Sequence, residues 1–133
     1  MPAVNETLHI EQGATYEHPS FSWHYDDPDN PGNPGDPIDL TGAVVRMQIR
    51  KGQQTPVLVE ATSDADSPYI TVDGPAGTIT IKLPADETNK LSVAEPKYDL
   101  EVVLPGGDVF RLLEGSVEVS PNITQVSGEP KVK

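Results

Sequence analysis

The chain has 133 residues, enough for one domain of ordinary size with a single hydrophobic core. Its 21 acidic residues outnumber its 9 basic ones, so the formal net charge is -12. A chain this acidic repels phosphate groups, and neither nucleic acid nor an anionic membrane is an expected partner. The absence of cysteine excludes disulfides, thiolate metal sites and a cysteine nucleophile. No stretch has the pattern of a signal peptide or the roughly 18 apolar residues that span a membrane.

The first 25 residues fit strands. In residues 15–25 an aromatic set alternates with a polar set, and we expect the aromatic set to face the core and the polar set to face water. The aromatic set is Pro19, Phe21, Trp23 and Tyr25, and the polar set is His18, Ser20, Ser22 and His24. Residues 26–37 consist only of Asp, Asn, Pro and Gly, and they predict a protruding, solvated loop.

Three short strands are predicted next, at residues 43–51, 56–61 and 69–72. A turn rich in glycine at residues 73–77 separates them from a fourth strand at residues 78–83. Side chains that alternate along these strands are expected to face the core. The expected inward residues are Ala43, Val45, Met47, Ile49, Val57, Val59, Ile79, Ile81 and Leu83.

The period changes at residues 84–91, where a proline and two acids come early and a lysine comes late. One or two helical turns fit this pattern, with Leu91 folded back onto the core. Residues 98–104 then resume strand alternation, and residues 105–108 make a hairpin turn into a long strand at residues 109–120. The inward sets are Tyr98, Leu100 and Val102 in the first strand, and Val109, Leu113, Val117 and Val119 in the second.

Arg111 and Gly115 interrupt the apolar set of the last strand, which predicts a bulge there or a strand covered on both faces. The whole pattern, about seven or eight short strands with one short helical turn, predicts an all-β protein built as an antiparallel β-sandwich. We expect residues 1–121 to form this single domain. Residues 122–133 lack strand alternation and predict an arm or a disordered tail.

A catalytic site is not expected, although the segment 18–26 contains the residue types of a Ser-His-Asp triad. In an extended strand His18 and His24 lie about 20 Å apart, at ~3.3 Å per residue. Ser22 and His24 are roughly 6–7 Å apart, which is too far for a hydrogen bond between nucleophile and base. We therefore predict a protein that is not an enzyme and that has no catalytic residue and no cofactor.

The acidic loop raises the question of calcium, because its carboxylates are hard oxygen ligands. The spacing does not match an EF-hand, and the repeated prolines stiffen the segment. No metal site is expected, and calcium is the minor alternative. Its candidate ligands are Asp26, Asp27, Asp29 and Asp36.

Aromatic rings could also stack on sugars and form a platform for host glycans. A sandwich of this size, however, needs most of its few aromatic residues for its core, so this interpretation is the less favoured one. The rings concerned are Trp23, Tyr25, Tyr16 and Tyr69.

Four blocks of the chain are similar, in sequence and in order, to a family of small tailed-bacteriophage and prophage proteins. That family resembles the immunoglobulin-like amino-terminal domain of phage baseplate upper proteins. The blocks are DLTGAVVRMQIR at residues 39–50, ITVDGPAGTITI at residues 70–81, YDLEV at residues 98–102 and LEGSV at residues 113–117. The match covers roughly residues 7–124. It departs from the family pattern in the longer loop at residues 26–37 and in Ala94-Glu95-Pro96, where a glycine is common.

The resemblance implies an immunoglobulin-like sandwich in which Tyr98 is a tyrosine corner, its hydroxyl bound to the backbone of the 84–91 crossover. It also implies a structural virion protein, made in the cytoplasm of the bacterial host, that contacts other virion proteins as a homo-oligomer or in many copies. Attachment to the tail, neck or baseplate is expected. The alternatives are a capsid decoration protein and a host-glycan-binding module. The residues expected to be structurally important are Trp23, Tyr98, Leu100 and Gly115.

Overall fold

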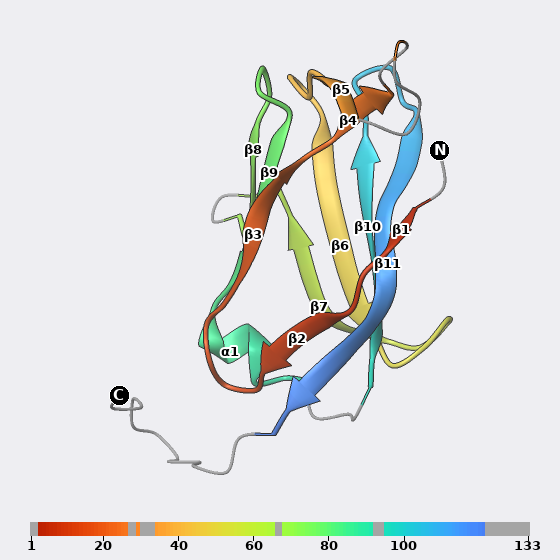
Figure 1. Ribbon diagram of the computed structural model, residues 1–133. Helices are drawn as coiled ribbons and strands as arrows, with labels where there is room; N and C mark the ends of the chain where they lie inside the picture. The colour runs from red at the N-terminus through yellow and green to blue at the C-terminus, as the bar shows by residue number, and fades with distance from the viewer. Residues whose placement is uncertain (1–2, 27–28, 30–33, 66–67, 92–94, 122–133) are drawn as a thin grey trace.

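The computed structural model describes residues 3–26, 29, 34–65, 68–91 and 95–121 (Figure 1). The protein is mostly β, with 57% of residues in strands and 4% in helix, and its sheets are largely antiparallel. The strands are β1 (Val4–Asn5), β2 (Leu8–Glu11), β3 (Tyr16–Ser22), β4 (His24–Asp26), β5 (Pro34–Pro37), β6 (Val44–Arg50), β7 (Val57–Thr62), β8 (Ile70–Asp73), β9 (Thr78–Leu83), β10 (Lys97–Val103) and β11 (Val109–Ser120). A short helix, α1 (Ala85–Thr88), connects β9 to β10.

The strands form one large sheet and two small ones. The large sheet has the order β1-β11-β10-β6-β7, and β2 also pairs with β11. The second sheet has the order β3-β9-β8, and β4 and β5 form a separate pair. Contrary to a purely antiparallel expectation, β1 and β2 run parallel to β11. These two short strands lie one after the other along the same edge of the last strand.

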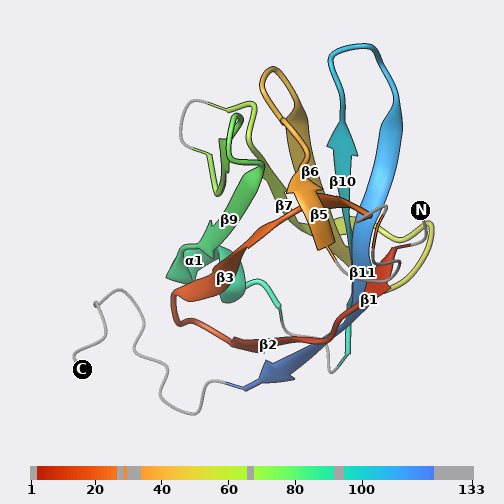
Figure 2. The same cartoon turned by 45° about the horizontal axis from the view of Figure 1, so that its top comes forward.

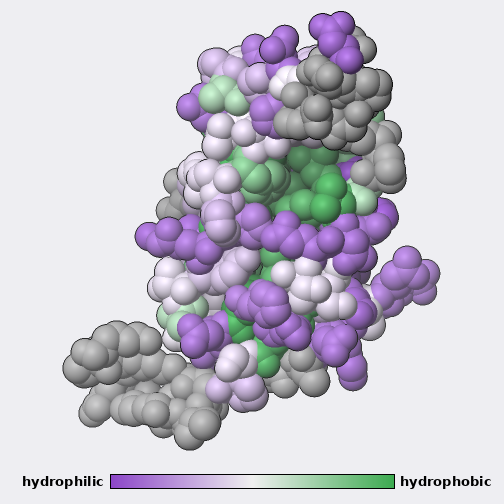
Figure 3. Space-filling view, viewed as in Figure 1, coloured by the Kyte–Doolittle hydropathy of each residue, from purple (hydrophilic) through white to green (hydrophobic). Residues whose placement is uncertain are grey.

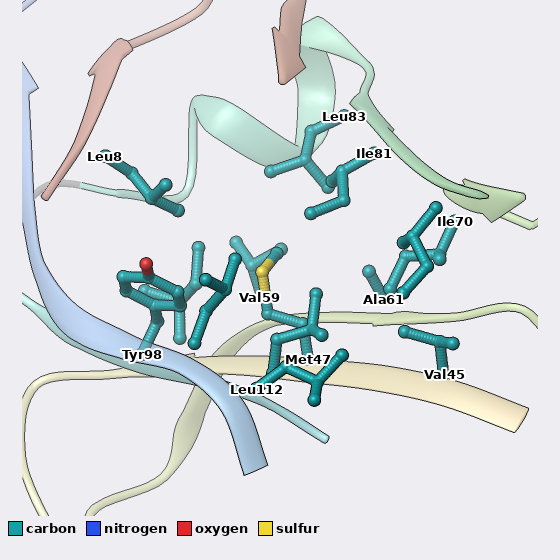
Figure 4. Packing of buried hydrophobic residues seen from close by; sticks show 14 of the residues in the cluster. Leu8, Val45, Met47, Val59, Ala61, Ile70, Ile81, Leu83, Tyr98 and Leu112 are labelled. Atoms are coloured by element: carbon teal, nitrogen blue, oxygen red, sulfur yellow. The ribbon is translucent and has the colours of Figure 1, made fainter. Parts of the chain in front are cut away.

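The large sheet and the β3-β9-β8 sheet enclose one hydrophobic core (Figures 1 and 2). Figure 4 shows how Met47 and Val59 from the large sheet approach Ile81 and Leu83 from the other sheet. The predicted inward residues of β6, β9 and β10 are confirmed, because they are at most 5% exposed. Ala43, predicted to belong to the first of these sets, lies before β6 and is only partly buried. Leu91 is fully buried after α1, as the change of period predicted.

The prediction that Val57 and Val109 face inward is wrong, because β7 and β11 each contain a bulge. In β7 the pairing shifts between Ile49 and Arg50, so that Leu58 is the extra residue and Val57 is 39% exposed. In β11 the shift opposite Leu100 confirms the predicted bulge. It also reverses the alternation before it, so that Val109 points outward and is 48% exposed.

The predicted faces of residues 15–25 are also partly wrong, and again a bulge is the cause. His18 pairs with Ile81 while Phe21 pairs with Ile79, so β3 carries one extra residue between them. His18 is therefore buried rather than solvated, Pro19 is exposed, and Phe21 faces inward after the bulge. The strand ends before Trp23, and Tyr25 in β4 is 59% exposed.

The segment 26–37 is not a loop throughout. Residues 34–37 form β5, which pairs with β4 through His24 opposite Pro37 and Asp26 opposite Pro34. The Ile38 amide extends this contact with a 2.7 Å hydrogen bond to the carbonyl of Trp23. The composition did not reveal this hairpin, because it has no apolar alternation. The rest of the predicted loop, including Asp27, and the predicted tail at residues 122–133 lie outside the described residues.

Candidate functional site

The candidate triad residues do not come together. The Ser20 hydroxyl bonds the hydroxyl of Thr80 at 2.8 Å, and His24 Nδ1 lies 3.0 Å from the Gly35 carbonyl. His18 points away from both, into the protein, where it contacts the Glu6 carboxylate. Each of these polar groups therefore connects its strand to a different neighbouring element.

The calcium alternative rests on residues that are only partly described. Asp29 and Asp36 are exposed, whereas Asp27 and the side chain of Asp26 lie outside the described residues. Within the part of the chain that the structure describes, no group of three or more histidines, aspartates or glutamates is placed to hold a metal ion.

The four candidate rings of a sugar platform are dispersed. Tyr16 begins β3, while Trp23 follows its end and packs on Phe110 with the ring centres 5.4 Å apart. The Tyr69 hydroxyl donates to the Glu87 carboxylate at 3.3 Å, and desolvation together with this carboxylate raises the pKa of Tyr69. Tyr25 is the most exposed ring. The structure therefore does not offer these four rings as one flat surface.

Glu6, between β1 and β2, joins three separate strands. Its amide donates to the Glu114 carbonyl at 3.0 Å, and its carbonyl accepts a 2.7 Å hydrogen bond from the Tyr98 hydroxyl. Its carboxylate lies 2.7 Å from His18 Nε2. The tyrosine-corner expectation is thus wrong in its partner: the Tyr98 hydroxyl binds the N-terminal segment, not the 84–91 crossover.

Both ring nitrogens of His18 lie next to hydrogen-bond acceptors. Its Nε2 lies 2.7 Å from the Glu6 carboxylate and its Nδ1 lies 2.7 Å from the Pro19 carbonyl, and its side chain is 8% exposed. Both partners are oxygen acceptors, whereas a neutral imidazole has only one N–H. Both contacts are hydrogen bonds only if the ring holds two protons or the Glu6 carboxyl is protonated.

The same cluster perturbs two tyrosines. Burial, and then the negative charge of Glu6, raises the pKa of Tyr16 to about 12. The pKa of Tyr98 is raised further, mainly by burial and next by Glu6. Gly115 completes the cluster, because a Cβ built on it would lie 2.5 Å from the Glu6 carbonyl oxygen. This arrangement fastens the N-terminal segment to the large sheet.

The outer face of the large sheet gathers the arginines of the chain. Although the net charge is -12, all three arginines, Arg46, Arg50 and Arg111, line a shallow hollow of about 580 Å³ on this face. Lys97 lines it too, together with four carboxylates and several glutamines. The carboxylates are Glu60, Asp99, Glu101 and Glu114.

Opposite charges alternate across this arginine face. Arg46 Nε lies 2.9 Å from Glu101, and Arg111 contacts both Glu114 at 3.1 Å and Asp99 at 3.5 Å. Burial, and then the charge of Glu101, raises the pKa of Asp99, while Arg111 opposes the shift. The hollow therefore carries paired charges on the surface of the sheet.

The arginine face could have been predicted from the alternation of side chains along two of the expected strands. The expected strand 43–51 places Arg46, Gln48 and Arg50 on its outer side, and alternation places Asp99 and Glu101 on the outer side of the strand at 98–104. No signal pointed to Glu6, because its role depends on contacts with strands far away in the sequence.

Comparison of the chain with protein families finds no match, and comparison with curated proteins finds none either. No helix of the described chain is long and apolar enough to cross a membrane.

Proposed function

We propose that the chain is an immunoglobulin-like β-sandwich that serves as a non-enzymatic structural component of a tailed-phage virion. It attaches to the tail, neck or baseplate through contacts with other virion proteins. The virion assignment is supported by the resemblance of the blocks at residues 39–50, 70–81, 98–102 and 113–117 to small phage proteins. The fold assignment is supported by the order of the strands.

The order of strands in the two larger sheets supports the immunoglobulin assignment. The β3-β9-β8 sheet corresponds to strands B, E and D, and β6, β10 and β11 correspond to C, F and G. The extra strand β7 beside β6 corresponds to the C′ strand of variable-type domains. Tyr98 stands near the start of β10, where that fold often carries a tyrosine.

The arginine face is the observation that most supports a binding function. Exposed ion pairs stabilise a fold by only about 0–1 kcal/mol each, so folding alone gives little reason to gather every arginine here. Arginine is enriched in protein interfaces, and alternating charges select partners by electrostatic complementarity. A firm sheet that presents such a pattern is suited to docking on another protein.

The proposal is tested by proteomics of purified phage particles. We expect the protein to be present at a few to a few dozen copies per particle, as suits the tail, neck or baseplate. Hundreds of copies would instead indicate capsid decoration. Absence from intact, infectious particles would overturn the proposal.

A paired variant tests the docking face. Arg46→Glu reverses one charge of this face beside Glu101, and we expect it to lower incorporation into particles by at least tenfold. Lys82→Glu is the matched control, because Lys82 forms an exposed 3.7 Å ion pair with Glu17 on the β3-β9-β8 sheet. Equal incorporation of the two variants, with both folded, would show that the face is not used.

A further inference from the structure

One side of the molecule leaves apolar residues accessible between β3 and the first part of β11. Figure 3 shows apolar atoms gathered there, below the connections at the top. We call this apolar patch the side opening. Phe21 in β3, Trp23 after its end and Phe110 in the first part of β11 are only partly buried, and the Trp23 and Phe110 rings pack on each other. Val4 in β1 is 61% exposed. Alternation places Val4 on the same side as Glu6, whose carboxylate reaches His18 in β3, so Val4 faces the opening.

The strand edges beside the side opening are free in the described chain. β1 begins its pairing with β11 at Leu113, opposite Val4. Residues 109–112 of β11 therefore have β10 as their only described strand partner, and β3 is paired on one side only, with β9. Unpaired strand edges are templates for an added strand, and an apolar floor beside them favours such addition.

The end of the molecule next to the side opening is acidic. The described residues of the segments that connect strands at this end, residues 23–26, 29, 34–43, 73–78 and 104–109, include no lysine or arginine (Figure 1). They include six aspartates, namely Asp26, Asp29, Asp36, Asp39, Asp73 and Asp108. A ligand strand with positive charge beyond its apolar residues would complement this end.

Residues 122–133 of the chain have this composition. Ile123 and Val126 come first, and Lys131 and Lys133 follow, with Glu129 as the one acid. The segment starts after β11, at the end of the molecule opposite the acidic connections (Figure 1).

The first apolar residues of the segment, Ile123 and Val126, cannot reach the side opening of their own molecule. Phe110 lies ten residues before Ser120 in β11, which is about 33 Å at ~3.3 Å per residue. Val126 is five residues beyond Pro121, so it reaches at most about 18 Å, at ~3.6 Å per residue. The edge of the second half of β11 is also already paired, with β1 and β2. Ile123 and Val126 can therefore enter the opening only in another copy.

We propose that residues 122–133 of one copy dock into the side opening of a neighbouring copy, as an added strand beside residues 109–112. Ile123 and Val126 cover Phe21, Trp23 and Phe110, and the two lysines meet the acidic connections. Because donor and acceptor lie at opposite ends, copies join head to tail, and the contact repeats from one copy to the next in an open chain or a ring. This inference rests on the proposed multi-copy structural role and names the partner as a second copy of the chain.

Two single-function variants test the inference. A chain that stops after Pro121 keeps the acceptor and lacks the donor segment. Val4→Arg keeps the donor and places a positive charge in the opening, at a residue exposed enough for the fold to tolerate it. Sedimentation velocity follows each protein from about 10 to 500 µM, and thermal melting establishes that each is folded.

We expect the full chain to form species that grow with concentration, and each variant alone to stay monomeric. An equimolar mixture of the two variants should form a heterodimer and nothing larger. Val57→Arg, at an exposed residue of β7 far from the opening, is the matched control and should associate like the full chain. A synthetic peptide of residues 122–133 should bind the shortened chain, and Lys131→Glu with Lys133→Glu in the peptide should weaken binding at least tenfold.

The inference is overturned if the full chain stays monomeric throughout, if the shortened chain associates equally well, or if the mixture stays monomeric. These results are independent of particle proteomics. A protein found in particles but monomeric in solution would refute only the head-to-tail contact, and a protein that forms chains but is absent from particles would refute only the virion assignment.

Discussion

The Tyr98 hydroxyl donates a 2.7 Å hydrogen bond to the backbone carbonyl of Glu6, a residue 92 positions earlier in the chain. The bond ties a central strand of the large sheet to the N-terminal segment that lies along β11. Because β1 has only two residues, its position depends on such contacts more than on its own pairing. The Glu6 cluster therefore keeps the N-terminal segment at the border of the side opening.

We expect Tyr98→Phe to lower the free energy of unfolding by about 1–2 kcal/mol, because the ring keeps its packing while the Glu6 carbonyl loses its donor. Chemical denaturation measures this difference. Tyr25→Phe is the control, since that ring is 59% exposed, and its unfolding midpoint should not change. Equal midpoints for Tyr98→Phe and the native chain would mean that the bond contributes nothing.

Gly115 provides a steric test of the same attachment. We expect Gly115→Ala to cost at least about 2 kcal/mol, since its Cβ would lie 2.5 Å from the Glu6 carbonyl and one strand must move. Hydrogen exchange should quicken at the Glu6 amide and in β1 and β2. Gly106→Ala, where a Cβ meets nothing within 4 Å, should stay within about 0.5 kcal/mol. Unchanged exchange at Glu6 in Gly115→Ala would contradict this account.

Much of the fold followed from alternation, and the errors about which residues face inward have one physical source. Strands β6, β9 and β10 pair without internal interruption of their apolar sets, and their buried residues were predicted correctly. In β3, β7 and β11 a single extra residue reverses the faces, which misplaced His18, Val57 and Val109. A bulge depends on which strand lies opposite, so alternation within one strand cannot locate it.

The candidate surfaces divide in the same way. The outer residues of the arginine face follow from alternation within two strands, and could be predicted. The Glu6 cluster and the side opening depend on β1 and β2 running parallel to β11. That arrangement pairs the first two strands of the chain with its last strand, and no local sequence pattern encodes a contact between such distant segments.

His18 should matter for stability despite its place in a predicted solvent face. His18→Leu keeps the apolar contacts but leaves the Pro19 carbonyl and the Glu6 carboxylate without their donor, and we expect a loss of about 1–3 kcal/mol. His9→Leu is the control, because the His9–Glu118 pair is 73% and 58% exposed and should contribute at most about 1 kcal/mol. If His18→Leu melted at or above the native temperature, burial of the polar pair would be a net cost to the fold.

Asp99 should make the protein less stable as pH rises through the acidic range. Its pKa is raised in the folded state, mainly by burial and then by Glu101, so the folded chain holds this proton more tightly than the unfolded chain. Stability from this group is therefore greatest below the ordinary aspartate pKa, and is lost as pH rises past it through the folded value. Asp99→Asn removes that loss but also the 3.5 Å contact with Arg111.

We expect Asp99→Asn to be more stable than the native chain at pH 7, which a higher unfolding temperature would show. The gain in the free energy of unfolding should be less than about 1 kcal/mol, because the side chain is 40% exposed. The difference should shrink as the pH falls below the ordinary aspartate pKa, because the native Asp99 then becomes neutral like the asparagine. Asp108→Asn, in the exposed hairpin turn, should show no stability difference from the native chain that shrinks as the pH falls. A variant less stable than the native chain at pH 7 would mean that attraction to Arg111 exceeds the cost of burying the carboxylate among Glu101 and Glu114, and the arginine face would then be held together by its ion pairs.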